Sequence, residues 1–362
     1  MNEPLFTIII DAYYKPHFLK MAVEAIFRQT YSNLEIILIN NGATPETLEY
    51  IYEVEKVDNR VKLIHFKENQ FSFDDPMKVI EVCLNAGLRA ATGEYVFYQS
   101  YDDKMADDYV EKMVALFQEN PECTSAAGIV VSIDADDNIM GTNPEPRSFN
   151  YRPRYMPGHI LALALSRGEK TMFAVPGTIF TFKRDVLIEA GGFHRSIEDS
   201  QLHGIVPFGI TGFDETAVFY WKRHEGQLNK MLTEKGYLTI DTLELLKDWS
   251  IHNKWESFFG KSNADSIVAY LKKSAYYELA SWFMISLLSL RLMAAFRILK
   301  ISWNYAGFWK LIPLNVWQQK RLVLLFFVPT RFLKLTIKQV FKILPGLATQ
   351  PSLNNLYKRV NK

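Results

Sequence analysis

Short apolar runs alternate with amphipathic segments over the first third of the chain. Continuous apolar runs bounded by polar turns are typical of strands that are buried on both faces. Strands are predicted at residues 6–10, 35–39, 61–66 and 95–98, and the first of them reads as a buried strand. Helices are predicted between them at residues 16–29, 45–54 and 75–91, and the first two have a proline near the start. Strands that alternate with helices form a parallel sheet with right-handed crossovers, so the sequence predicts an α/β fold.

The middle of the chain is less regular. Loops rich in Pro, Gly and Arg separate strand-like runs at residues 127–133, 178–182 and 217–221. From about Leu243 the pattern becomes helical. Hydrophobic residues make up 48% of the chain and charged residues 22%, which fits a folded protein without a long disordered region. The two cysteines, Cys83 and Cys123, have no CxxC partner, which argues against a disulfide framework or a zinc knuckle.

The overall charge of +1 hides a division between the body and the tail of the chain. After Ser266 there are 15 Lys and Arg residues and one acid, Glu278, so the tail carries +14 and the body −13. Basic residues interleaved with Trp, Phe and Leu favour an anionic membrane surface over nucleic acid or a cap on the core. The apolar runs are too short to span a bilayer, and the start lacks a signal peptide's basic region. We expect a cytoplasmic protein, peripheral at the inner face of the cell membrane.

Two polar segments follow predicted strands. Ligands of parallel sheets bind outside the carboxyl ends of the strands, so both segments are candidate binding positions. In Asn40-Asn41-Gly42 the glycine permits close approach of the backbone, although an ordinary turn explains this segment as well. Asp102 and Asp103 supply two carboxylates that suit Mg²⁺ or Mn²⁺. Alternatively, Asp103 caps the helix predicted at residues 107–117.

These segments resemble the opening of the family 2 glycosyltransferases. That family begins with a strand, P-T-Y-N, a helix that ends in Q-T-Y, and E-I-I-V-V-D-D-G-S-T. Residues 6–44 read FTIIIDAYYKPHFLKMAVEAIFRQTYSNLEIILINNGAT. The family's N-x-G, A-x-G-E-Y and D-x-D-D elements are similar to residues 85–87, 91–95 and 100–103. Several elements in the right order are far more specific than one short motif.

The resemblance continues to about Leu232. Residues 177–193, GTIFTFKRDVLIEAGGF, are similar to the family's acceptor segment. Glu198 and Asp199 then fall at the position of its E-D pair, whose Asp is the catalytic base. His224 falls at the metal-ligand histidine of the closing Y-R-x-H-x-G segment.

The resemblance implies a GT-A fold, which is a mixed, mainly parallel sheet flanked by helices. It implies a nucleoside-diphosphate sugar as donor, with a UDP-sugar favoured, and inversion at the anomeric carbon. One divalent cation, Mn²⁺ or Mg²⁺, would be held by Asp102 and His224. Asp199 is the expected catalytic base, with Glu198 as its competitor, because a carboxylate can take the proton of an attacking hydroxyl.

The resemblance also implies which residues bind the nucleotide sugar. They are Asp11, Ala12, Tyr13, Asn40, Gly42, Asn85, Ser100 and Tyr101. The chain departs from the family's pattern at several of these positions. Asp11 stands at the proline of P-T-Y-N, and Ser100 at the first Asp of D-x-D. Asn40 stands at an Asp, and its carbonyl can still accept a hydrogen bond from the imide of uracil or thymine.

We therefore expect a catalytic domain at residues 1–240, with a nucleotide-sugar half at 1–123 and an acceptor half at 124–240. A helical, basic and aromatic region is expected at residues 241–362. The first hypothesis is an inverting, metal-dependent glycosyltransferase of the hexosyltransferase type. It would extend a glycan or lipid-linked acceptor in cell-surface polysaccharide synthesis. The alternative is a catalytically weak homologue that binds sugar nucleotides or acts as a scaffold at the membrane.

Overall fold

The chain divides into two compact units. The first unit comprises Met1–Leu228 and Glu244–Leu271, and the second comprises Asn229–Leu243 and Lys272–Lys362. A computed structural model describes residues 3–72, 78–143, 153–158, 160, 180–193, 208–225, 227, 253–257, 260–269 and 272. The elements named below all belong to the first unit. The domain boundary at residue 240 stays a prediction, and the basic tail beyond Lys272 lies outside the described residues.

The described residues form ten strands and five labelled helices. The strands are β1 (Phe6–Ala12), β2 (Leu34–Asn41), β3 (Val61–Phe66), β4 (Tyr95–Gln99), β5 (Lys104–Met105), β6 (Cys123–Ile133), β7 (Ile139–Asn143), β8 (Tyr155–Pro157), β9 (Thr181–Lys183) and β10 (Ile210–Lys222). The helices are α1 (Pro16–Phe27), α2 (Pro45–Val57), α3 (Lys78–Ala90), α4 (Tyr109–Glu119) and α6 (Arg184–Glu189). The four strands and three helices predicted in the first third of the chain are therefore confirmed.

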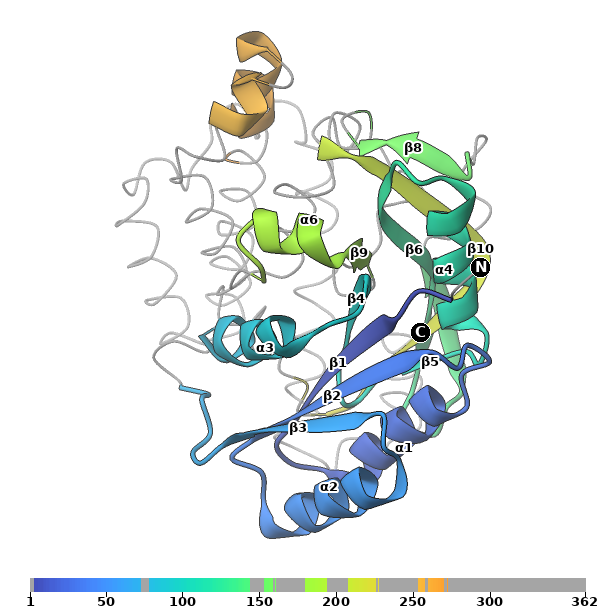
Figure 1. The fold of residues 1–362 in the computed structure, drawn as a ribbon, viewed down its shortest axis with the longest axis vertical. Coiled ribbons are helices and arrows are strands. Elements are labelled where there is room, and N and C mark those ends of the chain that lie inside the picture. The colour runs from blue at the N-terminus through green and yellow to red at the C-terminus, as the bar shows by residue number, and fades with distance from the viewer. Residues whose placement is uncertain are drawn as a thin grey trace, which may run out of the picture. The chain divides into compact units, whose positions relative to one another are not determined.

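These strands form one sheet in the order β3-β2-β1-β4-β9-β6-β10-β5, with β7 added beside β6 and β8 beside β10. β3, β2, β1 and β4 run parallel, as do β6 and β10. β5, β7, β8 and β9 pair antiparallel with their neighbours. Figure 1 shows α3 on one side of β1 to β3, and α1 and α2 on the other. The predicted mixed, mainly parallel sheet flanked by helices is confirmed.

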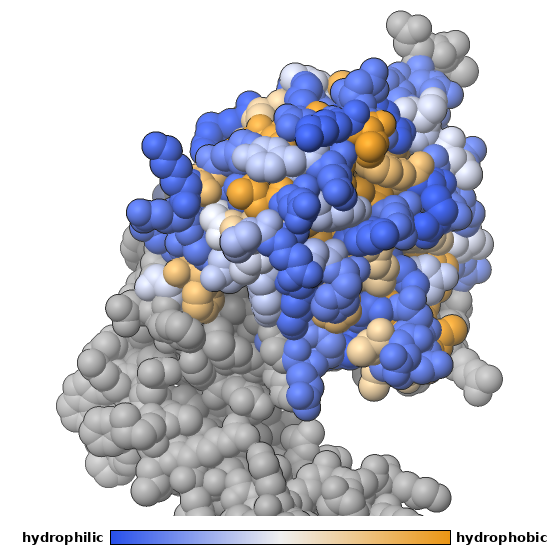
Figure 2. Space-filling view, turned by 90° about the horizontal axis from the view of Figure 1, so that it is seen from below, coloured by the Kyte–Doolittle hydropathy of each residue, from blue (hydrophilic) through white to orange (hydrophobic). Residues whose placement is uncertain are grey.

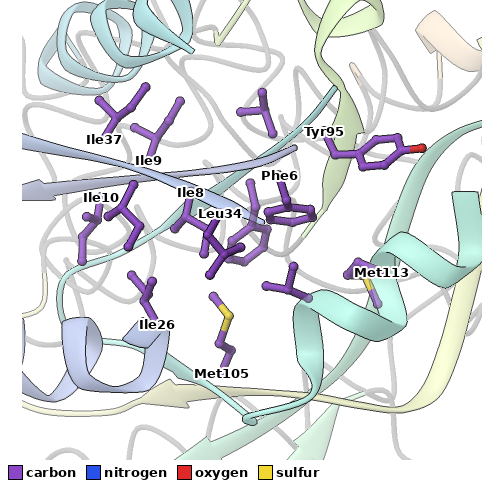
Figure 3. Packing of buried hydrophobic residues seen from close by; sticks show 14 of the residues in the cluster. Phe6, Ile8, Ile9, Ile10, Ile26, Leu34, Ile37, Tyr95, Met105 and Met113 are labelled. Carbon is purple, nitrogen blue, oxygen red and sulfur yellow. The ribbon is translucent and has the colours of Figure 1, made fainter. Parts of the chain in front are cut away.

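Both faces of β1, β2 and β4 are buried, whereas the edge strand β3 leaves Lys62 and His65 exposed. Ile8 and Ile10 of β1 point toward Ile26 of α1, whereas Ile9 points to the opposite side (Figure 3). On that side α3 packs so closely that a Cβ added to Gly87 would lie 2.6 Å from Cγ2 of Ile9. Burial on both faces explains why these strands read as continuous apolar runs. Each fully buried isoleucine contributes about 1.5–3 kcal/mol to stability.

The surface contrasts with this core. On the side of α2, which Figure 2 faces, hydrophilic residues predominate and apolar residues occupy small separate areas. Helix α2 accordingly buries Thr47, Ile51 and Val54 and leaves its acidic residues outside. Within the described ranges, no helix combines the length and the apolar character needed to cross a bilayer.

A buried carboxylate fastens the amino ends of the strands together. Glu35 of β2 accepts hydrogen bonds from Thr7 of β1 at 2.6 Å and from Lys62 of β3 at 2.5 Å. The backbone and hydroxyl groups of Thr92, just before β4, each donate to it at 2.7 Å. Burial by itself raises the pKa of Glu35, but these hydrogen bonds outweigh it and lower the pKa to about 2. The ionised carboxylate therefore stabilises the fold.

Replacing this carboxylate should lower the stability of the fold in a pH-dependent way. A pKa shift from 4.5 to about 2 corresponds to about 3 kcal/mol of unfolding free energy. This contribution is complete above pH 4.5 and is lost as the pH falls toward 2. Urea denaturation should therefore find Glu35→Gln less stable than the wild type by about 3 kcal/mol at pH 7, with a smaller difference at pH 3. Glu55→Gln, at an exposed position of α2, is the control and should change little; equal stability of both variants would contradict the role of Glu35.

Candidate functional site

The predicted cation ligands meet although they lie far apart in the sequence. Nε2 of His224 lies 2.8 Å from Oδ2 of Asp102, across a separation of 122 residues. Asp102 lies in the turn after β4, and His224 follows the end of β10. Both side chains are nearly buried, with 10% of the Asp102 side chain and 4% of the His224 side chain exposed. The fold thus brings a carboxylate and an imidazole into direct contact at one point.

The surroundings of His224 orient its ring. Nδ1 lies 2.8 Å from the backbone carbonyl of Glu225, whereas the nearest approach of the Lys15 ammonium to Nδ1 is 3.4 Å. A proton on Nδ1 can be donated to this carbonyl at the shorter distance, and Nε2 is then free to bind a cation between the ring and Asp102. Metal-ligating histidines are commonly oriented in this way. The ring also packs against Phe18 of α1, at 4.6 Å between ring centroids.

The donor set fits a small divalent cation. An imidazole nitrogen and a carboxylate oxygen are ligands of Mn²⁺ and related metals, and their 2.8 Å separation is close to the spacing of adjacent ligands on one ion, about 3 Å. In the part of the chain that the structure describes, no group of three or more His, Cys, Asp or Glu side chains gathers around a common point. The pair could therefore hold a cation whose other ligands come from a bound phosphate group or water, as is usual for Mg²⁺.

The polar residues on either side of Asp102, Ser100 and Asp103, make different hydrogen bonds. The hydroxyl of Ser100 donates to the other oxygen of Asp102 at 2.5 Å. Asp103 is buried, and its carboxylate accepts the backbone N–H of Lys222 at 2.9 Å. The alternative that Asp103 caps the following helix is wrong, because α4 begins only at Tyr109 and is preceded by Asp108 at its N-cap. Asp103 instead joins the turn after β4 to the end of β10.

A second carboxyl group lies at the end of β1. Oδ1 of Asp11 accepts a hydrogen bond from the hydroxyl of Tyr98 on β4 at 2.9 Å. Burial raises the pKa of Asp11 to about 6, with a further contribution from the negative charge of Asp102, although the Tyr98 hydrogen bond opposes this rise. Burial and the charge of Asp102 likewise raise the pKa of Asp103. The negative charge of Asp102 thus acts on both of these carboxyl groups, that of Asp11 and that of Asp103.

The turn after β2 is fixed by hydrogen bonds on both sides of one amide. Nδ2 of Asn40 lies 3.0 Å from Nδ1 of His65 on β3, and its Oδ1 accepts the backbone N–H of Ala43 at 2.7 Å. These two contacts define which way the amide points. Gly42 has a φ of 60°, and an added Cβ would lie 2.4 Å from the backbone nitrogen of Asn69. The glycine thus permits a close approach of the chain's own backbone at Asn69, and its part in binding a nucleotide sugar stays a prediction.

Aromatic side chains gather near the end of β1. The ring of Tyr14 lies 5.6 Å from that of Tyr13 and 5.9 Å from that of Tyr101. Tyr13 is 38% exposed, so its ring is accessible to a ligand. Ala12 is buried and pairs in register with Asn40. Four of the residues expected to bind a nucleotide sugar therefore lie at the carboxyl ends of β1, β2 and β4. They are Ala12, Tyr13, Asn40 and Tyr101.

Asn85 occupies a different position. It lies on α3, where its Nδ2 donates to the carbonyl of Phe193 at 2.7 Å and its Oδ1 accepts the N–H of Phe193 at 2.8 Å. Both halves of the amide therefore bind backbone of the segment after α6. The catalytic candidates Asp199 and Glu198 lie outside the described residues, so their role stays a prediction.

Comparison with known proteins decides the family. The model of "Glycosyl transferase family 2" matches residues 7–190, which is half of the chain. The chain belongs to glycosyl transferase family 2. The matched stretch includes Asp102 but ends before Asp199 and His224. The approach of His224 to Asp102 is therefore an observation independent of the family match.

Individual glycosyltransferases are similar over shorter stretches. An uncharacterised glycosyltransferase of Haemophilus influenzae is 31% identical over 142 residues, which are 39% of this chain and 42% of that protein. The putative glycosyltransferase EpsH of Bacillus subtilis is 31% identical over 114 residues, 32% of this chain and 30% of EpsH. The chain thus spans less than half of the length of these curated relatives.

A solved structure is similar over a longer stretch. It is that of the mannosyltransferase PcManGT of Pyrobaculum calidifontis in complex with GDP-Man and Mn²⁺. The match covers 88% of this chain and 89% of the PcManGT chain, with a TM-score of 0.47 and 16% sequence identity.

Lys15 is a site residue that the motifs of the glycosyl transferase family did not single out. Its ammonium donates to the carbonyl of Glu225 at 3.3 Å and lies 4.8 Å from the centre of the Tyr14 ring. Lys15 has a φ of 59° and a ψ of 68°, a left-handed conformation that is uncommon for residues other than glycine. Its sequence position directly before Pro16 gave no signal of this conformation.

The double hydrogen bond of Asn85 predicts a structural effect. Asn85→Ala leaves the N–H and the carbonyl of Phe193 without these partners, at a cost of about 2 kcal/mol in unfolding free energy. Chemical denaturation checks this value. Asn33→Ala is the control, because the Asn33 amide makes a single hydrogen bond within the described residues, to the carbonyl of Glu3 near the chain start. If Asn85→Ala kept full stability and lost only nucleotide-sugar affinity, the residue would act on the ligand and not on the fold.

Proposed function

We propose that the protein is an inverting, metal-dependent hexosyltransferase. It transfers a sugar from a nucleoside-diphosphate sugar, with a UDP-sugar favoured, to a hydroxyl of a glycan or lipid-linked acceptor. The observation that carries the proposal is the 2.8 Å approach of His224 to Asp102 at the carboxyl ends of the strands. Membership of glycosyl transferase family 2 supports glycosyl transfer as the reaction.

The reaction joins the acceptor oxygen to the anomeric carbon of the donor sugar. The bond from that carbon to the diphosphate breaks, and its electron pair leaves with the diphosphate. The acceptor proton passes to a carboxylate, for which Asp199 is the candidate and Glu198 the competitor. Attack from the face opposite the leaving group inverts the anomeric configuration. A divalent cation, Mn²⁺ or Mg²⁺, bound by Asp102 and His224 would supply positive charge beside the leaving diphosphate.

The chain's own residues would hold the donor around this point. Lys15 brings a second positive charge to the same edge, since its ammonium lies 3.4 Å from Nδ1 of His224. Tyr13 and Tyr101 offer aromatic rings on which a flat base can stack. Asn40, whose amide direction is fixed by His65 and Ala43, can accept a hydrogen bond from an imide N–H of uracil.

Donor turnover should depend on the candidate base and on the cation pair. Asp199→Asn should lower the rate of Mn²⁺-dependent transfer by about 10²–10⁴-fold, the usual contribution of a general base, and leave donor affinity nearly unchanged. His224→Ala should instead weaken Mn²⁺ activation. Initial rates over a range of Mn²⁺ and donor concentrations separate the two effects.

Asp185→Asn is the matched control, because the Asp185 side chain is 87% exposed, and it should behave like the wild type. Undiminished turnover in Asp199→Asn would remove Asp199 from the mechanism. A wild-type protein that binds the donor but neither transfers nor hydrolyses the sugar would support the alternative, a catalytically weak sugar-nucleotide-binding or scaffolding homologue at the membrane. Ser100 and the pair Asn40-Asn41 favour this alternative, since they supply a hydroxyl and two amides where the family's pattern has carboxylates.

We also propose that the basic tail attaches the protein to the inner face of the cell membrane. The sequence after Ser266 carries a formal charge of +14 and is rich in aromatic residues. Each basic residue near an anionic lipid surface contributes about 1 kcal/mol, so many of them together hold a protein at the surface without crossing the bilayer. A lipid-linked acceptor in cell-surface polysaccharide synthesis would fit this location.

Vesicle sedimentation tests the attachment. The full chain should sediment with vesicles that contain phosphatidylglycerol and stay in solution with pure phosphatidylcholine vesicles. Salt at 1 M should release it, because the Debye length falls to about 3 Å. The double variant Lys320→Glu, Arg321→Glu should bind more weakly, whereas Lys56→Glu, an exposed change on α2, should not. Equal sedimentation with both kinds of vesicle would refute attachment by charge.

A further inference from the structure

The turn between β6 and β7 is held rigid by its own side chains. Oδ1 of Asp134 accepts the backbone N–H groups of Asp136 and Asn138, each at 2.9 Å. The amide of Asn138 donates to Oδ2 of Asp134 at 3.0 Å. Asp137 has a φ of 66°, the left-handed conformation that Asp tolerates better than most residues. The turn therefore presents the side chain of Asp137 in a fixed direction.

The carboxylate of Asp137 binds two lysines from different strands. Its Oδ2 accepts a hydrogen bond from Lys104 of β5 at 2.7 Å, and its Oδ1 accepts one from Lys222 of β10. Lys104 follows directly after Asp102 and Asp103, and Lys222 lies two residues before His224. One carboxylate thus ties together the two segments that carry the proposed cation ligands.

We call Asp137 together with Lys104 and Lys222 the brace. Lys222 is the more buried of its two lysines. Only 2% of its side chain is exposed, so its ammonium depends on acceptors within the protein. Besides Asp137 it reaches the backbone carbonyls of Asp134 at 3.4 Å and Ala135 at 3.3 Å. The backbone N–H of the same lysine donates to the carboxylate of Asp103. The side chain therefore anchors the end of β10 to the turn, and the backbone anchors it to the residue after Asp102.

Backbone pairing alone holds these two segments only weakly. β5 has two residues, and its pairing with β10 consists of Met105 opposite Phe219 and Lys104 opposite Tyr220. After Lys222 the chain leaves the strand before it reaches His224. Metal ligands must be held to within about 0.5 Å of their working geometry. Beside such a short backbone pairing, the side-chain contacts of the brace help to hold the segments that carry Asp102 and His224.

We propose that Asp137, acting through Lys104 and Lys222, is a positioning residue that keeps His224 and Asp102 in the geometry that binds a divalent cation. This inference rests on the proposed function of that pair. The acidic turn is not itself a second cation site, because the two ammonium groups occupy the carboxylate of Asp137. Breaking the brace lets the end of β10 move relative to the turn after β4, and cation affinity falls although both ligands are intact.

Direct measurement of Mn²⁺ binding tests the brace. The full-length protein is titrated with Mn²⁺ and free Mn²⁺ is followed by electron paramagnetic resonance, in the presence of excess UDP and, in a parallel series, GDP. Asp137→Asn should weaken Mn²⁺ binding about 10-fold, at the low end of the 10- to 100-fold losses seen for residues that support metal ligands. Asp136→Asn removes the same charge from the same turn. It is the matched control and should stay within about twofold of the wild type, since its exposed side chain has no hydrogen bond in the described part of the chain.

Further variants separate positioning from general stability. Lys222→Met should weaken Mn²⁺ binding to a similar extent, and combining it with Asp137→Asn should add little, because both remove one brace. Lys222→Arg, which restores a buried cation, should recover part of the affinity. Circular dichroism at the assay temperature establishes that each variant is folded. If Lys222→Met does not fold, Lys104→Met, at a side chain that is 21% exposed, removes the other lysine of the brace.

The outcomes distinguish this inference from the proposed function. If His224→Ala abolishes Mn²⁺ binding while the folded Asp137→Asn and Lys104→Met variants bind like the wild type, the brace is refuted and the cation pair stands. If the wild type fails to bind Mn²⁺ with either nucleotide, or if His224→Ala binds it normally, the proposed cation site is refuted and the inference falls with it. Weaker binding in Asp137→Asn but not in Asp136→Asn supports the brace.

Discussion

The parallel pairing of β1 with both β2 and β4 is the constraint on which the rest of the site depends. It places Ala12 beside Asn40 on one side of β1 and Ile10 beside Gln99 on the other. The segments that follow the three strands must then emerge at one edge of the sheet. Polar side chains from separate parts of the chain meet there because the strand interiors are apolar and cannot hold them. At the opposite ends of the strands, Glu35 fastens the same strands by its hydrogen bonds.

The sequence predicted the parallel strands because their signal is local and strong. For β10 it predicted only residues 217–221, although the strand spans Ile210–Lys222. The missed half contains Gly212, Asp214 and Glu215, and the register of β10 against β6 shifts between Phe213 and Val218. Polar residues and an irregular register do not produce the apolar run from which a strand is inferred. The antiparallel strands β5 and β8 have two or three residues each, too few for any periodicity, whereas β9 overlaps the run predicted at residues 178–182.

Motif residues proved easier to find than to interpret. Gln29 belongs to the Q-T-Y element, and its buried amide donates to the carbonyls of Ala25 and Ala106 and accepts the N–H of Val110. It thereby joins the end of α1 to the start of α4. Asn85 was expected to bind nucleotide sugar, yet its amide holds the backbone of Phe193. A motif preserves spacing, but it does not say whether a polar side chain faces a ligand or another part of the chain. That distinction depends on contacts between distant residues.

Several departures from the family's pattern change the carboxyl groups near Asp102. Ser100 takes a carboxylate away from the D-x-D position, and its hydroxyl now donates to Asp102. Asp11 adds a carboxyl group at the proline position of β1, close enough for the charge of Asp102 to contribute to its pKa of about 6. A further carboxylate at position 100 would add repulsion to a site where burial already disfavours charge. Ser100 and the pair Asn40-Asn41 thus stand where the family's pattern has carboxylates, and Asp11 on β1 replaces only one of them. A cation between Asp102 and His224 would therefore meet less negative charge than the family's pattern places at this edge.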